Sequence, residues 1–173
     1  MIVVVMGVAG SGKTTVATML ADAMRCPFLE GDSLHPASNV EKMSRGIPLT
    51  NADRAPSLAA IRPRLLDAFE RQQSLIVACS ALTQSSRTIL AEGIPINWVY
   101  LKGDTTRIRS RLQHRPGHFM KAEMLASQLK ALEEPTDAIT ADVSMPPSAI
   151  VEGVLAELDE QIDVDGTSSA PTR

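Results

Sequence analysis

The stretch IVVVMGVAGSGKT, residues 2–14, decides the fold class of this chain. Its first five positions are apolar, which is typical of a strand covered on both faces. Residues 7–14 match the pattern G-x-x-x-x-G-K-[ST] at every fixed position, and apolar residues then continue at helical spacing over 13–24. Strand, glycine-rich loop and helix is the context that this pattern requires. The stretch therefore predicts a phosphate-binding loop at the start of an α/β domain.

The chemistry of this loop predicts its ligand. Glycines let the backbone bend so that successive N–H groups point at phosphate oxygens, and the following helix adds the dipole of its N-terminus. We expect Lys13 to reach the β- and γ-phosphates in a catalytic role, and Thr14 to hold Mg²⁺. The predicted nucleotide contacts are Gly7, Val8, Ala9, Gly10, Ser11, Gly12, Lys13, Thr14 and Thr15. Switches, motors and kinases share such a loop, so the reaction has to be inferred from other residues.

The rest of the chain alternates short apolar runs with amphipathic stretches. Runs at 27–29, 75–78, 98–101 and 138–141 predict four further strands. Helical spacing predicts helices over 13–24, 37–44, 57–71, 85–92, 105–113, 121–132 and 148–162, and Pro63 either kinks the third of these or marks its first turn. We predict a doubly wound α/β fold, a parallel sheet with helices on both faces, in one domain over residues 1–163. Residues 164–173 are polar and unpatterned, which predicts a flexible tail.

Composition and charge argue against several classes of protein. A net charge of −3 leaves no basic footprint for nucleic acid, and the longest apolar runs are far shorter than the roughly 20 residues of a membrane span. We expect a cytoplasmic protein without a nucleic-acid or membrane partner. Cys26 and Cys79 lack zinc-site spacing and are expected to be reduced, buried thiols. If the substrates are anions, positive charge has to be gathered locally.

Polar residues after the second predicted strand are the candidates for an acceptor site. Asp32 falls where ligands bind in doubly wound sheets, and its carboxylate could orient or deprotonate a hydroxyl aimed at the γ-phosphate. An Asx-turn or a helix N-cap is the alternative. His35, Asn39 and Lys42 could share one helical face, and Arg54 follows further on. The alternatives are a turn hydrogen bond for His35 and a solvated surface charge for Lys42 and Arg54.

The third predicted strand ends without the acidic residue that many triphosphate-hydrolysing proteins carry there. Residues 79–82 read Cys-Ser-Ala-Leu, so Mg²⁺ is expected on Thr14, phosphate oxygens and water, with Asp32 acting through a water. This favours a small-molecule kinase over a motor or a switch. Ser80 is a candidate acceptor contact. Arg87, close to the start of the next helix, is a candidate for an acceptor carboxylate, because a guanidinium matches carboxylate geometry.

Four arginines gather ahead of a Pro-Gly break, in the order Arg107, Arg109, Arg111 and Arg115. Such charge density beside the break predicts a short lid over about 115–130, in which Arg115 meets the transferring phosphoryl group. Arg107 and Arg109 are expected on an ordinary basic helix face. Arg111 could lie against the adenine base. His118 is a further candidate substrate contact.

With these residues in view, the sequence resembles the gluconate kinase family (gluconokinase, thermoresistant type) of P-loop kinases, from about Val3 to Val143. The resemblance rests on GVAGSGKT, on GDSLHPASNVEKMSRGIPLTNADRAP (31–56), on ACSAL (78–82), on LKGD (101–104), and on GHFM (117–120) with the following SQL and LEEP. It implies ATP:D-gluconate 6-phosphotransfer, Mg²⁺ dependence, a five-stranded parallel sheet with a short lid, and a homodimer. Two positions depart from the family: Ser57 replaces a usual Trp, and Ser86 a usual aromatic residue. Both changes are expected to loosen packing beside the acceptor pocket.

The hypothesis from sequence is that Asp32 aligns the terminal hydroxyl of gluconate for in-line attack while ATP and Mg²⁺ occupy the loop. The predicted catalytic residues are Lys13, Asp32 and Arg115. The predicted substrate contacts are Asp32, His35, Asn39, Lys42, Arg54, Ser80, Arg87 and His118. Three alternatives stay open at this point: a kinase for another small hydroxy acid such as shikimate, a nucleoside monophosphate kinase, and an ATP-gated binding or switch protein.

Overall fold

The computed structural model describes residues 1–113 and 123–167. Its centre is a sheet of five strands: β1 (Ile2–Met6), β2 (Phe28–Glu30), β3 (Leu75–Ala78), β4 (Ile96–Lys102) and β5 (Ile139–Asp142). The strands lie in the order β2-β3-β1-β4-β5 and every neighbouring pair is parallel. All five residues of β1 are buried, as its apolar run predicted. The predicted parallel sheet is confirmed.

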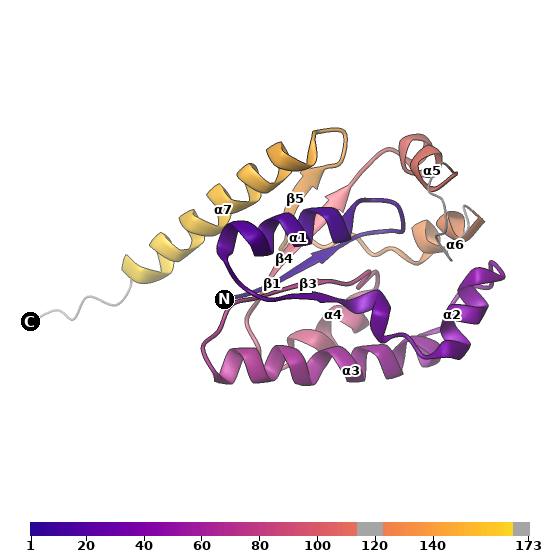
Figure 1. Ribbon diagram of the computed structural model, residues 1–173, viewed down its shortest axis with the longest axis horizontal. Coiled ribbons are helices and arrows are strands. Elements are labelled where there is room, and N and C mark those ends of the chain that lie inside the picture. The colour runs from indigo at the N-terminus through magenta and orange to yellow at the C-terminus, as the bar shows by residue number, and fades with distance from the viewer. Residues whose placement is uncertain (114–122, 168–173) are drawn as a thin grey trace, which may run out of the picture.

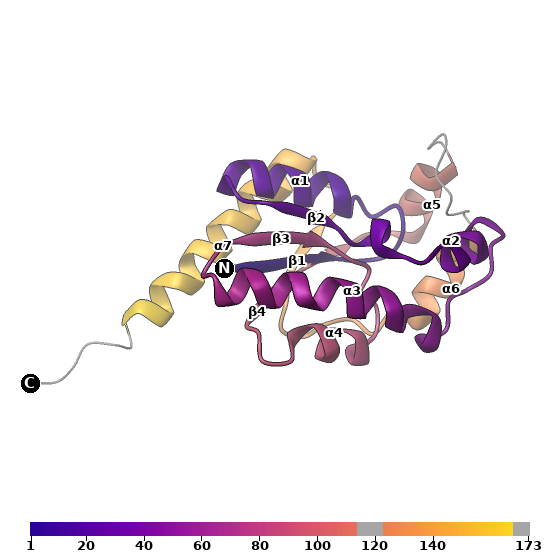
Figure 2. The same ribbon diagram turned by 60° about the horizontal axis from the view of Figure 1, so that its bottom comes forward.

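Helices cover both faces of the sheet (Figures 1 and 2). On one face α1 (Lys13–Met24) packs beside α7 (Pro147–Thr167), and on the other α3 (Asn51–Glu70) packs beside α4 (Gln84–Ala91). Side chains of a strand alternate between faces, so β1 feeds two cores. Val3 and Val5 join the cluster under α1 and α7, whereas Ile2, Val4 and Met6 join the cluster under α3 and α4.

The remaining helices gather beyond the carboxyl ends of the strands, at the right of Figure 1. They are the 3₁₀ turn η1 (Gly31–Leu34), α2 (Ala37–Ser44), α5 (Thr105–Gln113) and α6 (Glu123–Ala131). In a doubly wound sheet this edge is where ligands bind. The fold therefore places the phosphate-binding loop and the polar segment after β2 at the same edge.

Helix α3 begins earlier than the predicted 57–71. Its N-cap is Thr50, whose side chain accepts from the Asp53 backbone N–H while the Asp53 side chain accepts from the Thr50 N–H. This reciprocal pair of hydrogen bonds stabilises the first turn of α3. The residues of that turn are mostly polar, so the spacing of apolar residues did not reveal it. Pro63 lies inside the helix, so it does not mark the first turn.

Helix α7 runs to Thr167, so the first four residues of the predicted tail 164–173 are helical. Extending an existing helix avoids the cost of nucleation, which allows it to continue through a polar sequence. Residues 168–173 lie outside the described part. Cys26 is only partly buried, against expectation, whereas Cys79 is buried, and both thiols are free. Within residues 1–113 and 123–167, no helix is both long enough and apolar enough to cross a membrane.

Candidate active site

The phosphate-binding loop has the backbone that its glycines predicted. Gly7, Gly10 and Gly12 have φ values of 143°, 79° and 101°, a region that disfavours other residues. A Cβ on Gly10 would lie 2.7 Å from Leu112 Cγ. Helix α1 begins directly after Gly12 without a side-chain cap, so its first N–H groups are open to a ligand.

Two polar side chains of the loop fit a triphosphate. Lys13 is 7% exposed, and its Nζ donates to the Val8 carbonyl at 3.2 Å. Among the described residues, Ser11 Oγ is a buried polar atom without a hydrogen-bond partner. A buried hydroxyl and ammonium beside a cradle of N–H groups are suited to phosphate oxygens.

Thr14 lies beside a carboxylate that sequence analysis missed. Its Oγ1 donates to Glu30 Oε2 at 2.6 Å, and Glu30 Oε1 accepts from the Asp32 backbone N–H at 3.3 Å. Mg²⁺ favours one or two protein oxygens together with phosphate oxygens and water. Thr14, Glu30 and Asp32 therefore fit a magnesium site, and the position of Glu30 at the end of β2 was the signal available in the sequence.

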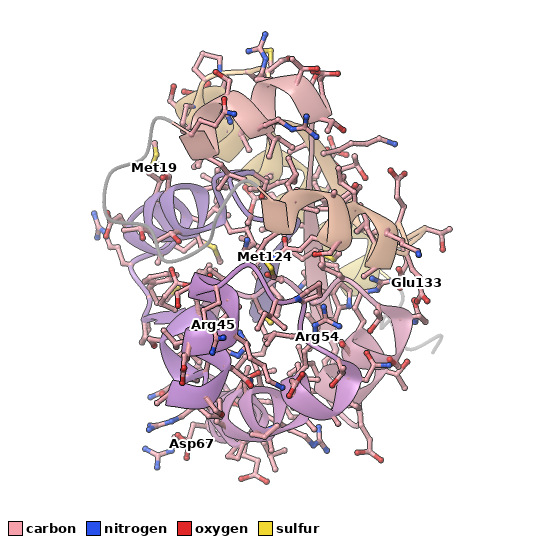
Figure 3. All side chains as sticks on the ribbon, turned by 90° about the vertical axis from the view of Figure 1, so that its right-hand side faces the viewer. Met19, Arg45, Arg54, Asp67, Met124 and Glu133 are labelled. Carbon is pink, nitrogen blue, oxygen red and sulfur yellow. The ribbon has the colours of Figure 1, made fainter. Side chains whose placement is uncertain are left out.

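The predicted acceptor residues Asp32, His35, Arg54 and Ser80 line one cavity between η1, α3 and the end of β3. Asp32 also lines the small cavity of the phosphate-binding loop, together with Lys13 and Thr14. Figure 3 looks onto this end of the molecule, where Arg54 of α3 lies near Met124 of α6, another lining residue. One carboxylate thus borders both the nucleotide site and the acceptor cavity.

The charges around this cavity are set by burial. Burial lowers the pKa of His35, outweighing the nearby Asp32 charge that raises it, so the imidazole is neutral at pH 7. Burial also lowers the pKa of Arg54, and the Asp53 charge opposes that shift. An arginine nevertheless stays protonated in proteins. Burial raises the pKa of the Cys79 thiol, which borders the same cavity, to about 11. Arg54 therefore supplies positive charge here, and Cys79 stays an inert thiol.

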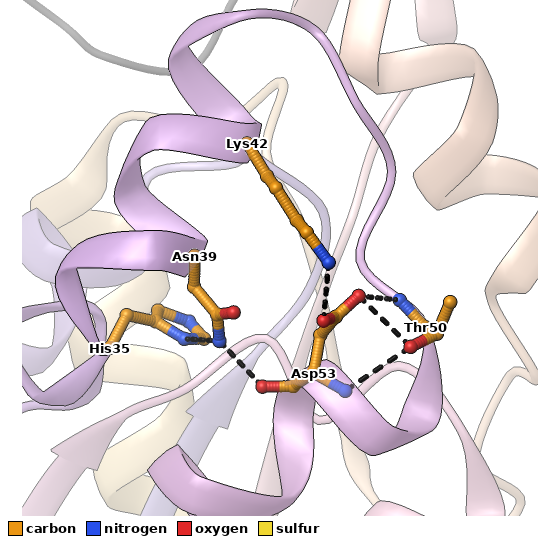
Figure 4. Close-up of polar contacts among 5 residues, drawn as sticks. All are labelled: His35, Asn39, Lys42, Thr50 and Asp53. Carbon is orange, nitrogen blue, oxygen red and sulfur yellow. Dashed lines mark hydrogen bonds and ion pairs between the residues drawn. The ribbon is translucent and has the colours of Figure 1, made fainter.

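Asn39 and Lys42 contact Asp53 rather than the cavity (Figure 4). Lys42 Nζ donates to Asp53 Oδ1 at 2.6 Å, and Asn39 Nδ2 donates to the Asp53 carbonyl at 2.5 Å and lies 3.5 Å from His35 Nδ1. Asp53 Oδ2 accepts from the N–H and hydroxyl of Thr50. The hydrogen bond from Lys42, followed by those from Thr50, lowers the Asp53 pKa to about 2. We call this group, Asn39, Lys42, Thr50 and Asp53, the Asp53 clasp. It joins α2 to α3.

Arg87 is not brought to the acceptor cavity. It is 3% exposed, and its guanidinium donates to the carbonyls of Ala81 (3.1 Å) and Leu82 (3.3 Å) and to Gln84 Oε1 (2.8 Å). Those carbonyls belong to the loop that joins β3 to α4, where Ala81 has a φ of 40°. Arg87 therefore satisfies the loop's buried backbone groups, a demand that no sequence pattern reveals.

Ser57 and Ser86, the two positions that the resemblance marks as unusual, both line the acceptor cavity. Ser57 Oγ donates to the Arg54 carbonyl at 2.8 Å, and Ser86 Oγ lies 2.8 Å from Thr83 Oγ1. Each of these hydroxyl groups makes its hydrogen bond to a residue near the start of its own helix. If these two serines loosen the packing, as expected from the sequence, the loosened region is therefore the wall of the acceptor cavity.

Arg111 borders a third cavity, on the outer side of the phosphate-binding loop. Gly12, Thr15, Val143 and Met145 also line it, and Arg111 Nη2 donates to the Val143 carbonyl at 2.8 Å. An adenine base next to a guanidinium and apolar side chains would fit there. Arg115 and His118 lie outside the described residues, as does the first part of the predicted lid.

Gln128 of α6 is a site residue that sequence analysis missed. Its Oε1 accepts from the Ala9 backbone N–H at 2.6 Å, and the side chain lines the acceptor cavity. A glutamine on an amphipathic helix carries no chemical signal of its own. Only the fold brings it to a loop 119 residues away.

Comparisons with known proteins identify the family. Residues 2–135 match the AAA domain family. The thermoresistant gluconokinase of Escherichia coli K12 is 42% identical over 166 residues, which cover 93% of each chain. The gluconokinase of Gluconobacter oxydans 621H is 50% identical over 135 residues, which cover 78% of this chain and 76% of that one. The crystal structure of a gluconokinase from Sinorhizobium meliloti 1021 matches with a TM-score of 0.87 and 42% identity over 97% of both chains.

The identities and their coverage extend well beyond the phosphate-binding loop. The predicted fold class and the resemblance drawn from the sequence are both confirmed. The chain belongs to the gluconokinase family and has its P-loop kinase fold.

Proposed function

We propose that this protein is a gluconokinase that transfers the γ-phosphoryl group of ATP to the 6-hydroxyl of D-gluconate. The observation that carries the proposal is the position of Asp32, which lines both the loop cavity and the acceptor cavity. A carboxylate at that junction can accept a hydrogen bond from the attacking hydroxyl and align it with the phosphorus. The names and coverage of the relatives favour gluconate as the acceptor.

Lys13 and the N–H groups of residues 7–14 would hold the triphosphate. Mg²⁺, when bound, neutralises charge on the β- and γ-phosphate oxygens. Thr14 would hold it directly, because a hydroxyl oxygen is a ligand that the ion accepts, and Glu30 and Asp32 would orient its waters. Arg111 would lie against the adenine base.

Within the acceptor cavity each polar residue has a separate task. Arg54 would pair with the gluconate carboxylate, since a guanidinium binds carboxylates through two parallel hydrogen bonds. His35 and Ser80 would bind the polyol hydroxyls, because a neutral imidazole and a hydroxyl can each donate and accept. Arg115 and His118 stay predictions for the lid. The homodimer and the cytoplasmic location also remain predictions. Light scattering of the purified chain would test the homodimer.

An acceptor panel tests the proposal. ADP release is measured with D-gluconate, shikimate, other sugar acids and nucleoside monophosphates, and we expect release that depends on gluconate. Equal release of ADP without any acceptor would favour an ATP-gated switch. Faster release with shikimate or a nucleoside monophosphate would mean that this compound, and not gluconate, is the substrate. Asp32→Asn should lower kcat by about 100-fold or more, because it removes a general base and its alignment, while the Kd of an ATP analogue stays near the wild-type value. An unchanged kcat would remove Asp32 from the mechanism.

A further inference from the structure

The loop that joins β3 to α4, residues 79–83, forms a continuous stretch of the acceptor cavity wall. Consecutive residues of this loop line the cavity: Cys79, Ser80, Ala81 and Leu82. The Ser80 carbonyl also accepts from the N–H of Gly7, the first residue of the phosphate-binding loop, at 3.4 Å. The path of residues 79–83 therefore determines the shape of the acceptor cavity beside the nucleotide loop.

Ala81 has a backbone conformation that an alanine disfavours. Its φ of 40° lies in the left-handed region, where the Cβ comes too close to the following carbonyl oxygen. Among the described residues, the other non-glycine residues with positive φ are Arg25 and Gln72, and each lies at the end of a helix, where this conformation is common. Ala81 follows a strand, so a helix end does not explain its conformation. Strained backbone of this kind persists only where surrounding contacts hold it, and it gathers at functional sites.

Arg87 supplies contacts that hold this conformation. Its guanidinium is 3% exposed and donates to the carbonyls of Ala81 and Leu82, and to Gln84 Oε1. The direction of the Ala81 carbonyl depends on the φ and ψ of Ala81, so a bond to that carbonyl opposes a change in its conformation. Glu133, which follows α6, adds a second anchor, because its N–H donates to the Leu82 carbonyl at 2.8 Å and its carboxylate accepts from the Gln84 N–H.

We propose that Arg87 is a positioning residue for the acceptor, which keeps residues 79–83 in the strained path that shapes the acceptor cavity. This inference rests on the proposed function. Arg87 does not line the cavity, so its effect on the acceptor passes through the loop. Without the guanidinium, the Ala81 carbonyl loses a donor and the residue relaxes toward negative φ. The cavity wall moves with it.

This role requires the fork of the guanidinium and not only its charge. A guanidinium donates in several fixed directions at once, whereas the ammonium of lysine is a point charge on a flexible stem. Arg87→Lys therefore keeps the positive charge and loses the contact with three acceptors. The substitution separates a positioning role from electrostatic attraction of an anionic acceptor.

The test is steady-state kinetics of the full chain, with gluconate and ATP varied in turn. For Arg87→Lys and Arg87→Met we expect the KM for gluconate to rise about 10-fold, the effect of losing hydrogen bonds to the acceptor. The KM for ATP should stay within about 3-fold of the wild-type value, because residues 7–14 supply the triphosphate contacts.

Arg62→Met is the matched control. Arg62 also donates to two backbone carbonyls, those of Ile89 at 3.4 Å and Glu92 at 2.8 Å, but at the C-terminal end of α4. Arg62 does not line the acceptor cavity. The control should lower the Tm and leave both KM values unchanged.

A second-site substitution tests the role of the strain. Glycine adopts positive φ without strain, so Ala81→Gly combined with Arg87→Met should lower the raised KM for gluconate by about 3-fold or more. If Arg87 only stabilised the fold, the two substitutions would act independently and no recovery would occur. Should Arg87→Met fail to fold, the same measurements on Arg87→Lys, alone and combined with Ala81→Gly, decide the question.

The outcomes separate the possibilities. A wild-type KM for gluconate in Arg87→Lys overturns the inference, because attraction by charge would then suffice. Equal rises in the KM for gluconate and for ATP, or no recovery with Ala81→Gly, indicate a general loss of structure and also overturn it. A wild type without turnover of gluconate in the acceptor panel overturns the proposed function and this inference with it. A wild type with turnover, whose KM for gluconate does not depend on Arg87, overturns this inference alone.

Discussion

Gly31→Ala should impair phosphoryl transfer without unfolding the protein. Gly31 joins Glu30 and Asp32 at the end of β2, and a Cβ there would lie 2.5 Å from the Ala78 carbonyl oxygen of β3. The oxygen belongs to the main chain and the backbone fixes the position of the Cβ, so no side-chain rotation can relieve the clash. The segment that carries Asp32 has to move away from β3.

The size of this movement sets the expected effect. Ordinary van der Waals contact begins at 3.4 Å, so the distance must grow by the difference from 2.5 Å, about 0.9 Å. A misplacement of about 1 Å in a catalytic group can cost about 100-fold in rate. That factor corresponds to about 2.7 kcal/mol in the activation barrier. We therefore expect kcat for gluconate to fall by about 100-fold.

The assay is ADP release at saturating gluconate, paired with binding of an ATP analogue as the check on folding. Gly153→Ala is the matched control, because Gly153 is exposed on α7 and its Cβ would meet nothing within 4 Å. That change should leave kcat unchanged and raise stability by about 1 kcal/mol, since alanine favours a helix over glycine. If Gly31→Ala binds the analogue normally and keeps kcat within about 3-fold, the argument from displacement is wrong.

Three further predictions concern neighbouring contacts. Thr50→Ala removes the N-cap of α3 and should lower the free energy of unfolding in urea by about 1 kcal/mol; no change would mean that the cap contributes nothing. The Asp53 pKa is lowered from 3.8 to about 2, so its contribution to stability is complete above pH 3.8 and is lost as the pH falls toward 2. In Lys42→Met this acid-induced loss should be smaller, and an unchanged pH profile of the unfolding free energy would contradict the assignment. Glu30→Ala should raise the Mg²⁺ concentration for half-maximal kcat by about 10-fold, because Thr14 loses its partner; an unchanged requirement would place Glu30 outside the metal site.

The sheet and the nucleotide loop were predictable because their signals are local. A run such as Ile2–Met6 is apolar throughout only where both faces are covered, and the loop glycines are needed wherever the backbone adopts positive φ. Both signals lie within a few consecutive residues. The number of strands followed from these patterns and the family resemblance, whereas the strand order β2-β3-β1-β4-β5 was not predicted and comes from the structure.

Long-range polar contacts were not predictable in the same way. Arg87 and Lys42 have the side chains expected of anion-binding residues, yet one satisfies loop carbonyls and the other pairs with Asp53. Gln128 shows the reverse case, since a residue without any chemical signal contacts the phosphate-binding loop. A sequence gives the type of a donor, whereas its partner depends on which segments the fold brings together.

The Asp53 clasp bears on how this acidic chain binds an anionic acceptor. Among the described residues that line the acceptor cavity, Arg54 is the one lysine or arginine, and burial keeps His35 neutral. Asp53 directly precedes Arg54 and could neutralise it, but both of its carboxylate oxygens are engaged by Lys42 and Thr50. We therefore expect Lys42 to favour acceptor binding without touching the acceptor. By occupying the neighbouring carboxylate, it would leave the Arg54 guanidinium available for the carboxylate of the substrate.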